Sequence, residues 1–417
     1  MKWGRLRNLT AERPLAWAQL SHQKARLAVA LTGVAFANIL MFAQLGIRAV
    51  LFDGITLIHE HLQGELFLIS SYSRALGFQS FARVYLYQAN AVPGVDTASP
   101  LYILGQVDWI NPEQLPAEHP IPPELLSPPG QDQSGDQEIQ IFPDRVKILA
   151  FNLTQPAFTL PEINQQLDKL KEPDSILYDR LSQDGLGPIP DLITQKPQLT
   201  TVMGNRRTQI AGLFTLGSTL FTKGHVIMSD LNYAARNGPE SLESVSVGLV
   251  SLDAGADPLQ VKAQIQQALP PSIQVLTREE LIQKEVAFWE TDPSGTVLNF
   301  GAMMGFVVGV IVVYQVLYSD VLEHLPEYAT LKAMGFADNA LLRVVLQEAM
   351  ILAVLGFVPG CVASVGVYSL LSSLTKIPLS LRPDVMVQVF ILTIVMCMGA
   401  GGIATQKLRQ ADPADVF

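Results

Sequence analysis

The chain has 417 residues with a net charge of −10, and 49% of its residues are hydrophobic while only 16% are charged. This length allows a membrane part and one or two further modules, and the residue balance suits a protein partly in lipid and partly in water. The acidic net charge argues against nucleic-acid binding.

Four long apolar stretches predict transmembrane helices, because about 20 apolar residues are needed to span the hydrocarbon core of a bilayer. The first is too long for a signal-peptide core and has no clear cleavage site after it, which indicates an uncleaved anchor. The predicted spans are residues 27–47, 295–318, 344–375 and 385–406.

The distribution of Lys and Arg predicts the orientation of these spans. Six such residues precede the first span, while Lys407 and Arg409 follow the fourth. The positive-inside rule then places both termini in the cytoplasm. Residues 1–26 are expected to hold a cytoplasmic amphipathic helix or, alternatively, a simple tail. The remaining expected segments are a domain outside the cytoplasm at 48–294, a cytoplasmic loop at 319–343, a short outer loop at 376–384 and a cytoplasmic tail at 407–417.

The segment between the first two spans predicts a large α+β domain. It carries 29 acids and 15 bases over residues 49–292 and has no cysteine, so its core alone must hold it together. A proline-rich stretch at 112–140 predicts a flexible insertion. Helices are expected at 79–89 and 257–269, and strands at 65–70, 146–152, 175–178, 208–214, 225–228, 245–252 and 273–276.

The two junctions between this domain and the membrane predict stalk helices continuous with spans one and two. Residues 49–61 can extend the first span as helix, and Thr277 with Glu280 forms a capping box that begins a helix before the second span. Asp292 and Pro293 indicate a break in that second helix.

Small and polar residues inside the spans give further candidates. Gly301, Gly305 and Gly309 are four residues apart, a spacing that allows close helix packing. The contact could join two copies of the chain in a homodimer or could lie within one subunit. Glu348 near the start of the third span is either a helix cap near the cytoplasmic interface or a functional carboxylate.

The cytoplasmic loop between spans two and three is the most specific segment. Pro326 opens and Gly335 closes a helix of about two turns, which is too short to be stable alone and is expected to dock on a partner. Tyr328, Leu331 and Met334 would form its docking face.

The run from Glu327 to Gly335 resembles the coupling-helix loop of the MacB/FtsX-type ABC permeases. Further segments resemble the DevC branch of that group, found in cyanobacteria: Pro14–Leu20, Gly64–Ser70, Gly212–Gly217, Ser229–Tyr233 and Lys407–Phe417. The resemblance implies a homodimer in the inner (plasma) membrane that works with an ABC ATPase subunit, a periplasmic adaptor and a TolC-like outer-membrane channel. It also implies that ATP and Mg bind to the ATPase and that this chain has no cofactor. It assigns ATPase coupling to Glu327, Tyr328, Leu331, Lys332, Met334 and Gly335.

The function predicted from this resemblance is that of an exporter's membrane subunit, with cargo such as envelope glycolipid. The sequence contains no phosphate-binding GxxxxGK[ST] loop, no GxSxG elbow and no HExxH motif, and His59 and His61 have the wrong spacing for zinc. A non-catalytic subunit is therefore expected, without a metal site. Two alternatives remain: an FtsX-like activator of a periplasmic cell-wall hydrolase, and a membrane sensor that has no ATPase.

Overall fold

The computed structural model describes residues 24–114, 144–196, 198–219, 222–323, 338–375 and 381–410. The chain divides into two compact units, which are described separately. Met1–Ala49 together with Pro293–Phe417 form one unit, called the membrane unit, and Val50–Asp292 form the other, called the external unit after its predicted position.

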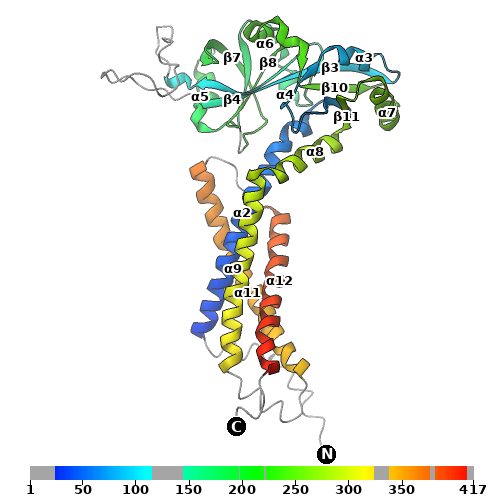
Figure 1. Ribbon diagram of the computed structural model, residues 1–417. Coiled ribbons are helices and arrows are strands. Elements are labelled where there is room, and N and C mark those ends of the chain that lie inside the picture. Colours follow the sequence, from blue (N-terminus) through cyan, green and yellow to red (C-terminus); the bar gives the residue numbers. More distant parts are fainter. Residues whose placement is uncertain are drawn as a thin grey trace, which may run out of the picture. The chain divides into compact units, whose positions relative to one another are not determined.

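The described residues contain four helices that are long and apolar enough to cross a membrane (Figure 1). They are α2 (Lys24–His61), α9 (Pro293–Glu323), α11 (Asp338–Thr375) and α12 (Pro383–Gln410). A helix satisfies its own backbone hydrogen bonds, as a lipid environment requires. Buried side chains such as Phe42, Leu352 and Met396 form the core between these helices. The four predicted spans are thus confirmed as helices.

The external unit is built on a nine-stranded sheet of mixed direction, in the order β11-β1-β10-β3-β4-β8-β5-β7-β6. An additional pairing joins Trp109 of β3 to Met203 of β6, so six of the strands close on themselves. A separate short sheet pairs β2 (Phe81–Ala82) with β9 (Ser244–Val245). The strands of the large sheet are β1 (Leu66–Ser70), β3 (Val95–Ile110), β4 (Asp144–Phe151), β5 (Ser175–Asp179), β6 (Leu199–Met203), β7 (Arg206–Phe214), β8 (His225–Ser229), β10 (Val247–Leu252) and β11 (Ile273–Thr277).

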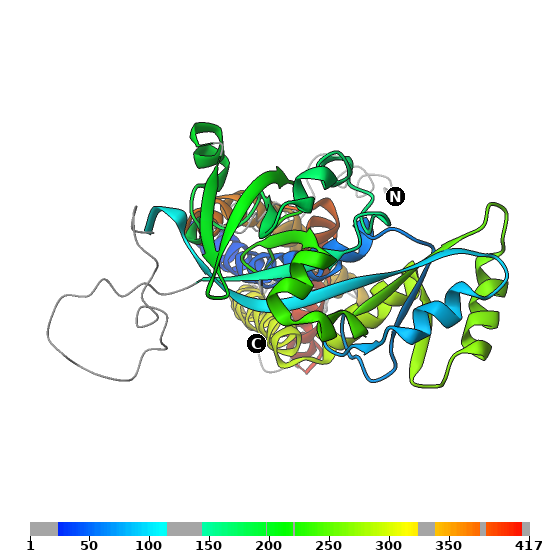
Figure 2. The ribbon, with the colours of Figure 1, turned by 90° about the horizontal axis from the view of Figure 1, so that it is seen from above.

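Each face of the large sheet is covered by its own apolar core. One core includes residues of α3 (Val84–Asn90), α5 (Ile189–Gln195), α6 (Asp230–Asn237) and α7 (Pro258–Ala268). The opposite core includes Ile58 of α2 and residues of α4 (Pro161–Asn164) and α8 (Arg278–Thr291). Figure 2 shows α6, drawn in green, lying over the strands. The end of α2 therefore belongs to the core of the external unit.

The predicted α+β class is confirmed, and the strand predictions mostly agree with the structure. All seven predicted strands are present, although residues 245–252 are divided between β9 and β10. The prediction missed β3 and β6. Strand β3 was obscured by Pro100 and Gly105, residues that usually interrupt strands, and it tolerates an irregularity between Leu104 and Val107.

Two helix predictions needed adjustment. The helix expected at 79–89 begins only at Val84, because Phe81 and Ala82 pair with β9. The stalk helix before the second span is not continuous with it: α8 ends at Thr291 and Asp292 has an extended backbone, with φ −65° and ψ 147°. The physical reason is Pro293, whose ring disfavours a helical conformation at the preceding residue. By contrast, α2 runs without interruption from the first span through His61.

Candidate functional site

The predicted coupling residues Glu327 to Gly335 lie outside the described residues, as do the N-terminal residues 1–23 and most of the proline-rich stretch. The coupling role of Glu327, Tyr328, Leu331, Lys332, Met334 and Gly335 therefore stays a prediction. The structure does place the other candidates, and it reveals a set of contacts at the end of α2 that sequence reasoning missed.

The three glycines of α9 lie against α2 of the same chain. A Cβ atom added at Gly305 would lie 3.3 Å from the Leu40 Cβ and 3.5 Å from the Met41 backbone nitrogen. One added at Gly309 would lie 2.9 Å from the Ala37 Cβ, and Gly301 faces Gln44. Glycine thus allows the two helices to approach closely. A contact between two copies of the chain through these glycines stays a prediction.

A second close approach joins α2 to α11. A Cβ atom at Gly356 would lie 2.6 Å from the Val34 Cγ1, and one at Gly360 would lie 2.7 Å from the Asn38 Cβ. The Tyr368 hydroxyl donates a hydrogen bond to the Phe42 carbonyl oxygen. The first span is therefore held tightly by two neighbours.

Asn38 connects three helices of the membrane unit. Its side chain is fully buried, its Nδ2 donates to the Gly356 carbonyl at 3.5 Å, and its Oδ1 accepts from the Thr393 hydroxyl at 2.6 Å. The sequence contained a signal for this contact, since an asparagine within an apolar span needs hydrogen-bond partners. Glu348 is also fully buried, and it lies ten residues inside α11, which begins at Asp338, so it is not a helix cap.

The principal candidate site is the junction between the end of α2 and α8, here called the stalk clamp and defined by His59, Arg278 and Glu285. The Arg278 guanidinium donates to the carbonyl oxygens of His59, Leu62 and Gly64, the last two at 2.9 Å. These include carbonyls at the C-terminus of α2, which have no partner within the helix. Arg278 therefore caps α2 from the first residue of α8.

Arg278 is fixed in turn by its own surroundings. Its guanidinium carbon lies 5.2 Å from the centre of the Phe67 ring, a cation–π distance. The predicted capping box is present, with the Thr277 hydroxyl accepting from the Glu280 amide and the Glu280 carboxylate accepting from the Thr277 amide. Lys262 pairs with that carboxylate, and this hydrogen bond holds the pKa of Glu280 below its usual value.

The second contact of the stalk clamp is a buried pair between helices α2 and α8. The His59 Nε2 lies 3.4 Å from the Glu285 Oε2, and the side chains are only 1% and 7% exposed. The Glu285 carboxylate also accepts from the Leu76 amide at 2.7 Å and from the Trp289 indole at 2.9 Å. Burial alone would raise the pKa of Glu285, but the His59 imidazole and these donors hold that pKa below its usual value.

The other side of the same α2 segment contacts the loop that follows β7. A Cβ atom at Gly54 would lie 2.9 Å from the Thr219 Cβ, and one at Gly217 would lie 3.2 Å from the Leu57 Cδ2. The fully buried Asp179 carboxylate anchors this loop by accepting from the amides of Leu216 at 3.1 Å and Gly217 at 2.7 Å. The end of α2 is therefore held by α8 and by this loop together.

Asp179 also lies beside a buried histidine. The His225 Nδ1 is 3.5 Å from the Asp179 Oδ2, and neither side chain is exposed. Burial lowers the pKa of His225, although Asp179 opposes that shift. The pair thus supports the loop that contacts α2.

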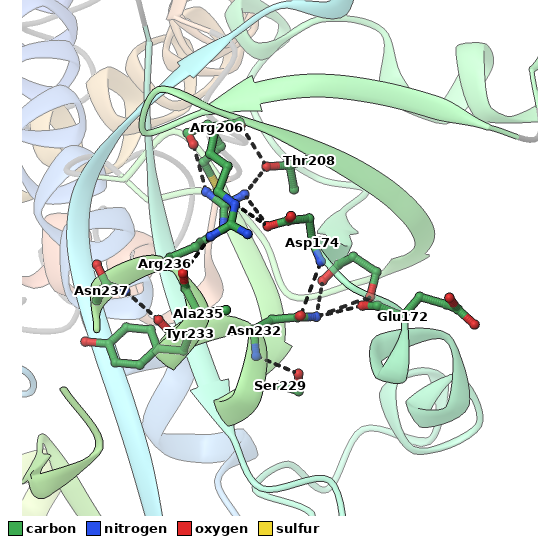
Figure 3. A network of polar contacts seen from close by, with 12 residues as sticks. Glu172, Asp174, Arg206, Thr208, Ser229, Asn232, Tyr233, Ala235, Arg236 and Asn237 are labelled. Atoms are coloured by element: carbon green, nitrogen blue, oxygen red, sulfur yellow. Dashed lines mark hydrogen bonds and ion pairs between the residues drawn. The ribbon is translucent and has the colours of Figure 1, made fainter. Parts of the chain in front are cut away.

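A separate polar network lies around α6 of the external unit (Figure 3). Asp174 Oδ1 lies 2.9 Å from the Arg206 Nε and 3.6 Å from the Arg236 Nη2. Asn232 donates to the Glu172 carbonyl at 2.9 Å, and Arg236 donates to the Met203 carbonyl at 2.8 Å. These contacts join α6 to the strands beneath it, and burial lowers the pKa of Arg236.

The stalk clamp was missed because its residues are far apart in sequence. His59 was considered only as a possible metal ligand, and no group of three or more metal-ligating side chains occurs in the part of the chain that the structure describes. One signal was available. A cation at the first position of a helix opposes the helix dipole, so Arg278 at the start of α8 indicates another partner.

Comparison with known proteins gives one family match. Residues 299–413 match the family described as the FtsX-like permease C-terminal domain. No curated protein matches the chain. The crystal structure of the extracellular domain of the ABC-type transporter YknZ from Gram-positive bacteria has a TM-score of 0.30 and 11% identity, covering 51% of this chain and 98% of its own. The periplasmic region of MacB from Actinobacillus actinomycetemcomitans has a TM-score of 0.32 and 6% identity, covering 54% of this chain and 94% of its own.

Proposed function

We propose that this chain is a member of the MacB/FtsX-type ABC permease superfamily and the membrane subunit of an ABC exporter of the DevC kind, because its residues 299–413 match the FtsX-like permease C-terminal family. Permeases of this superfamily work with an ATPase. In the proposed complex that ATPase is a separate subunit, which binds ATP and Mg and docks on the loop from Pro326 to Gly335. The family match, which includes this loop, is the observation that carries the proposal.

We propose that α2 transmits motion from the spans to the external unit. Helix α2 is 38 residues long, or about 57 Å at the rise of an α-helix, and has no interruption between the first span and His61. A continuous helix passes on tilt and axial displacement. Helix α9 lies against the same α2 through its glycines, so displacement of the second span would act on the first.

In this proposal the stalk clamp connects the end of α2 to the rest of the external unit. Arg278 and Glu285 hold α2 to α8, while the loop after β7 holds its other side. The last turn of α2 belongs to the same apolar core as one face of the large sheet. Displacement of this turn is therefore expected to move the sheet. In the proposed cycle this movement drives cargo toward a periplasmic adaptor and a TolC-like outer-membrane channel. We propose a homodimer as the working form and envelope glycolipid as the class of cargo, with the external unit in the periplasm.

The test is purification of the full chain from native membranes in mild detergent, with and without trapped ATP, and identification of the proteins that accompany it. An ATPase with an adaptor supports the exporter. An ATPase with a cell-wall hydrolase would instead favour the activator role, and the absence of an ATPase under both conditions would contradict the coupling proposal and favour a sensor.

A variant of the loop sharpens this test. We expect Leu331→Asp, and charge reversal at Glu327, to abolish stimulation of ATP hydrolysis while the spans stay folded. Leu331→Met is the matched control, because it keeps an apolar side chain of similar volume. Unchanged stimulation in Leu331→Asp would show that this loop does not contact the ATPase.

A further inference from the structure

Three aromatic side chains gather beside the stalk clamp, where the loop at residues 71–80 meets the last turn of α8. The Phe78 and Phe288 ring centroids are 5.5 Å apart, and those of Phe288 and Trp289 are 5.3 Å apart. Phe78 is 56% exposed, and the other two rings are half-buried. These three residues are called the aromatic patch. Nothing in the proposed transport cycle requires them to be exposed.

The loop that presents Phe78 has a well-defined, hydrogen-bonded structure. The Leu76 amide donates to Glu285 at 2.7 Å, the Phe78 amide donates to the Ala75 carbonyl at 3.2 Å, and the Gln79 amide donates to the Ser73 hydroxyl at 3.3 Å. Gly77 has a φ of +79°, and a Cβ atom there would lie 2.9 Å from the Ile103 Cγ2. The fold therefore fixes Phe78 in an exposed position, at the usual cost of exposing apolar surface to water.

The position of the aromatic patch along the chain indicates what covers it. Trp289 precedes Gly295, where the second candidate span begins, by six residues. Six residues extend at most about 20 Å even when fully stretched, and about 9 Å at the rise of a helix. The Asp292 amide still donates to the Phe288 carbonyl at 2.9 Å, so the chain remains compact up to the start of α9. The aromatic patch thus lies within reach of the surface at which the span leaves the hydrocarbon.

The chemistry of the aromatic patch suits that surface. Each headgroup region of a bilayer is about 5–8 Å thick outside the hydrocarbon core, and Trp and other aromatic rings are enriched there. The Trp289 indole nitrogen already donates to Glu285, which leaves the apolar part of the ring to meet lipid. Arg74 is exposed on the same loop and provides a positive charge for lipid phosphates.

We propose that the aromatic patch binds lipid in the headgroup region of the outer leaflet and tethers the loop at 71–80 and the end of α8 to the bilayer surface. Because Glu285 bonds both to this loop and to His59, the tether acts directly on the stalk clamp. The end of α8 then serves as a pivot at the membrane surface, about which α2 and the sheet can move.

The experiment compares two glutamines that each follow an exposed aromatic residue. Gln79 follows Phe78 in the loop, while Gln88 follows Tyr87 on α3, and all four side chains are exposed. Each glutamine is replaced by cysteine in a full-length background with Cys361→Ala and Cys397→Ala, labelled with an environment-sensitive fluorophore, and placed in lipid nanodiscs. Quenching is then measured with lipids that carry a doxyl group near the headgroup, and with aqueous iodide.

We expect lipid quenching to be several-fold stronger at position 79 than at position 88, and we expect Phe78→Ser to reduce it toward the level at position 88. Equal lipid quenching at the two positions overturns the proposal. So does a label at position 79 that is shielded from iodide yet not quenched by lipid, because a protein surface such as a second copy of the chain would then cover the patch.

A second measurement needs no substitution. The native chain in nanodiscs is irradiated with a photoactivatable phosphatidylglycerol or phosphatidylcholine that carries its reactive group near the headgroup. Cross-links within residues 72–79 or 286–291 support the proposal, while cross-links confined to the four spans contradict it. Neither measurement involves the ATPase, so its outcome is independent of the exporter proposal.

Discussion

The contacts that stabilise the membrane unit internally differ in kind from those that stabilise the external unit. In the membrane unit, glycines allow helices to touch, and Asn38 and Tyr368 provide polar links between α2 and its neighbours. The external unit buries large aromatic side chains such as Trp109 and Tyr102, and it also buries carboxylates beside histidines. The difference follows from the solvent, because lipid gives apolar side chains no hydrophobic reason to associate.

Both kinds of contact occur along α2. Close packing at small residues extends as far as Gly46, and the Arg278 guanidinium donates hydrogen bonds near the end of the helix. A helix held differently at its two ends can respond to changes in either unit. The predictions below separate the two kinds of contact, beginning with the largest expected effect.

The strongest test of the charged contacts is Arg278→Ala. Removal of the guanidinium leaves three carbonyl oxygens without this donor. Since a hydrogen bond to a charged group contributes about 1.5–3 kcal/mol, we expect a loss of about 3 kcal/mol in the free energy of unfolding. Amide hydrogen exchange over residues 55–64 should accelerate, while exchange in α12 stays unchanged. Arg278→Lys should recover only part of the loss, because it keeps the charge but lacks the planar fork. Full stability of Arg278→Ala would show that the cap contributes nothing.

The corresponding test of the glycine contacts is Gly305→Val. Its Cβ would lie 3.5 Å from the backbone nitrogen of Met41, and the two added methyl groups would force α9 away from α2. Overpacking of this kind costs about 1–3 kcal/mol. The measurement is thermal unfolding of the purified chain in detergent.

Gly399→Val in α12 is the matched control, because nothing lies within 4 Å of a Cβ added at Gly399. The same β-branched residue in an open position carries the helix-propensity cost without the collision. If the two variants were equally destabilised, close packing of α9 on α2 would not be the cause.

The third prediction uses pH to examine the buried pair of the stalk clamp. The pKa of Glu285 is lower in the folded protein than its ordinary value, so this carboxylate stabilises the fold at neutral pH. That contribution is complete above the unfolded pKa of about 4.3 and is lost as the pH falls through the lower folded value. Burial lowers the pKa of Lys147 and of Lys284, and the nearby Glu285 carboxylate opposes both shifts.

We therefore expect Glu285→Gln to lower the melting temperature at pH 7 and to reduce its further decrease between about pH 5 and pH 3 relative to the native chain. Glu279→Gln is the control, since Glu279 is an exposed residue of the same helix. An unchanged acid profile in Glu285→Gln would show that this carboxyl group does not couple to folding.

Local sequence patterns predicted the secondary structure of both units better than they predicted contacts between distant segments. The spans were predictable because lipid demands long uninterrupted apolar helices, and the α7 helix was predictable because Asp257 caps it and Pro258 begins it. The helix that packs against the α9 glycines was not predictable, because these glycines could face a helix of the same chain or of a second copy. The stalk clamp was not predictable because His59 and Arg278 are brought together by the pairing of β1 with β11, which no local pattern reports.

The smallest expected effect concerns the polar link between α2 and α12. Hydrogen bonds between membrane helices contribute about 0.6 kcal/mol on average, because the unfolded helices also find partners in the membrane. A double-mutant cycle of Asn38→Leu and Thr393→Val measures the link between these two side chains, which are 2.6 Å apart. We expect a coupling free energy of about 0.6 kcal/mol by unfolding in detergent. Thr32→Val replaces Thr393→Val in the control cycle, because the Thr32 hydroxyl donates only within its own helix, to the Ala28 carbonyl, and should show no coupling to Asn38. A coupling several-fold larger than expected would mean that the membrane unit, like the external unit, depends on its buried polar contacts, and the contrast between the two units would then lie in the number of such contacts rather than in their strength.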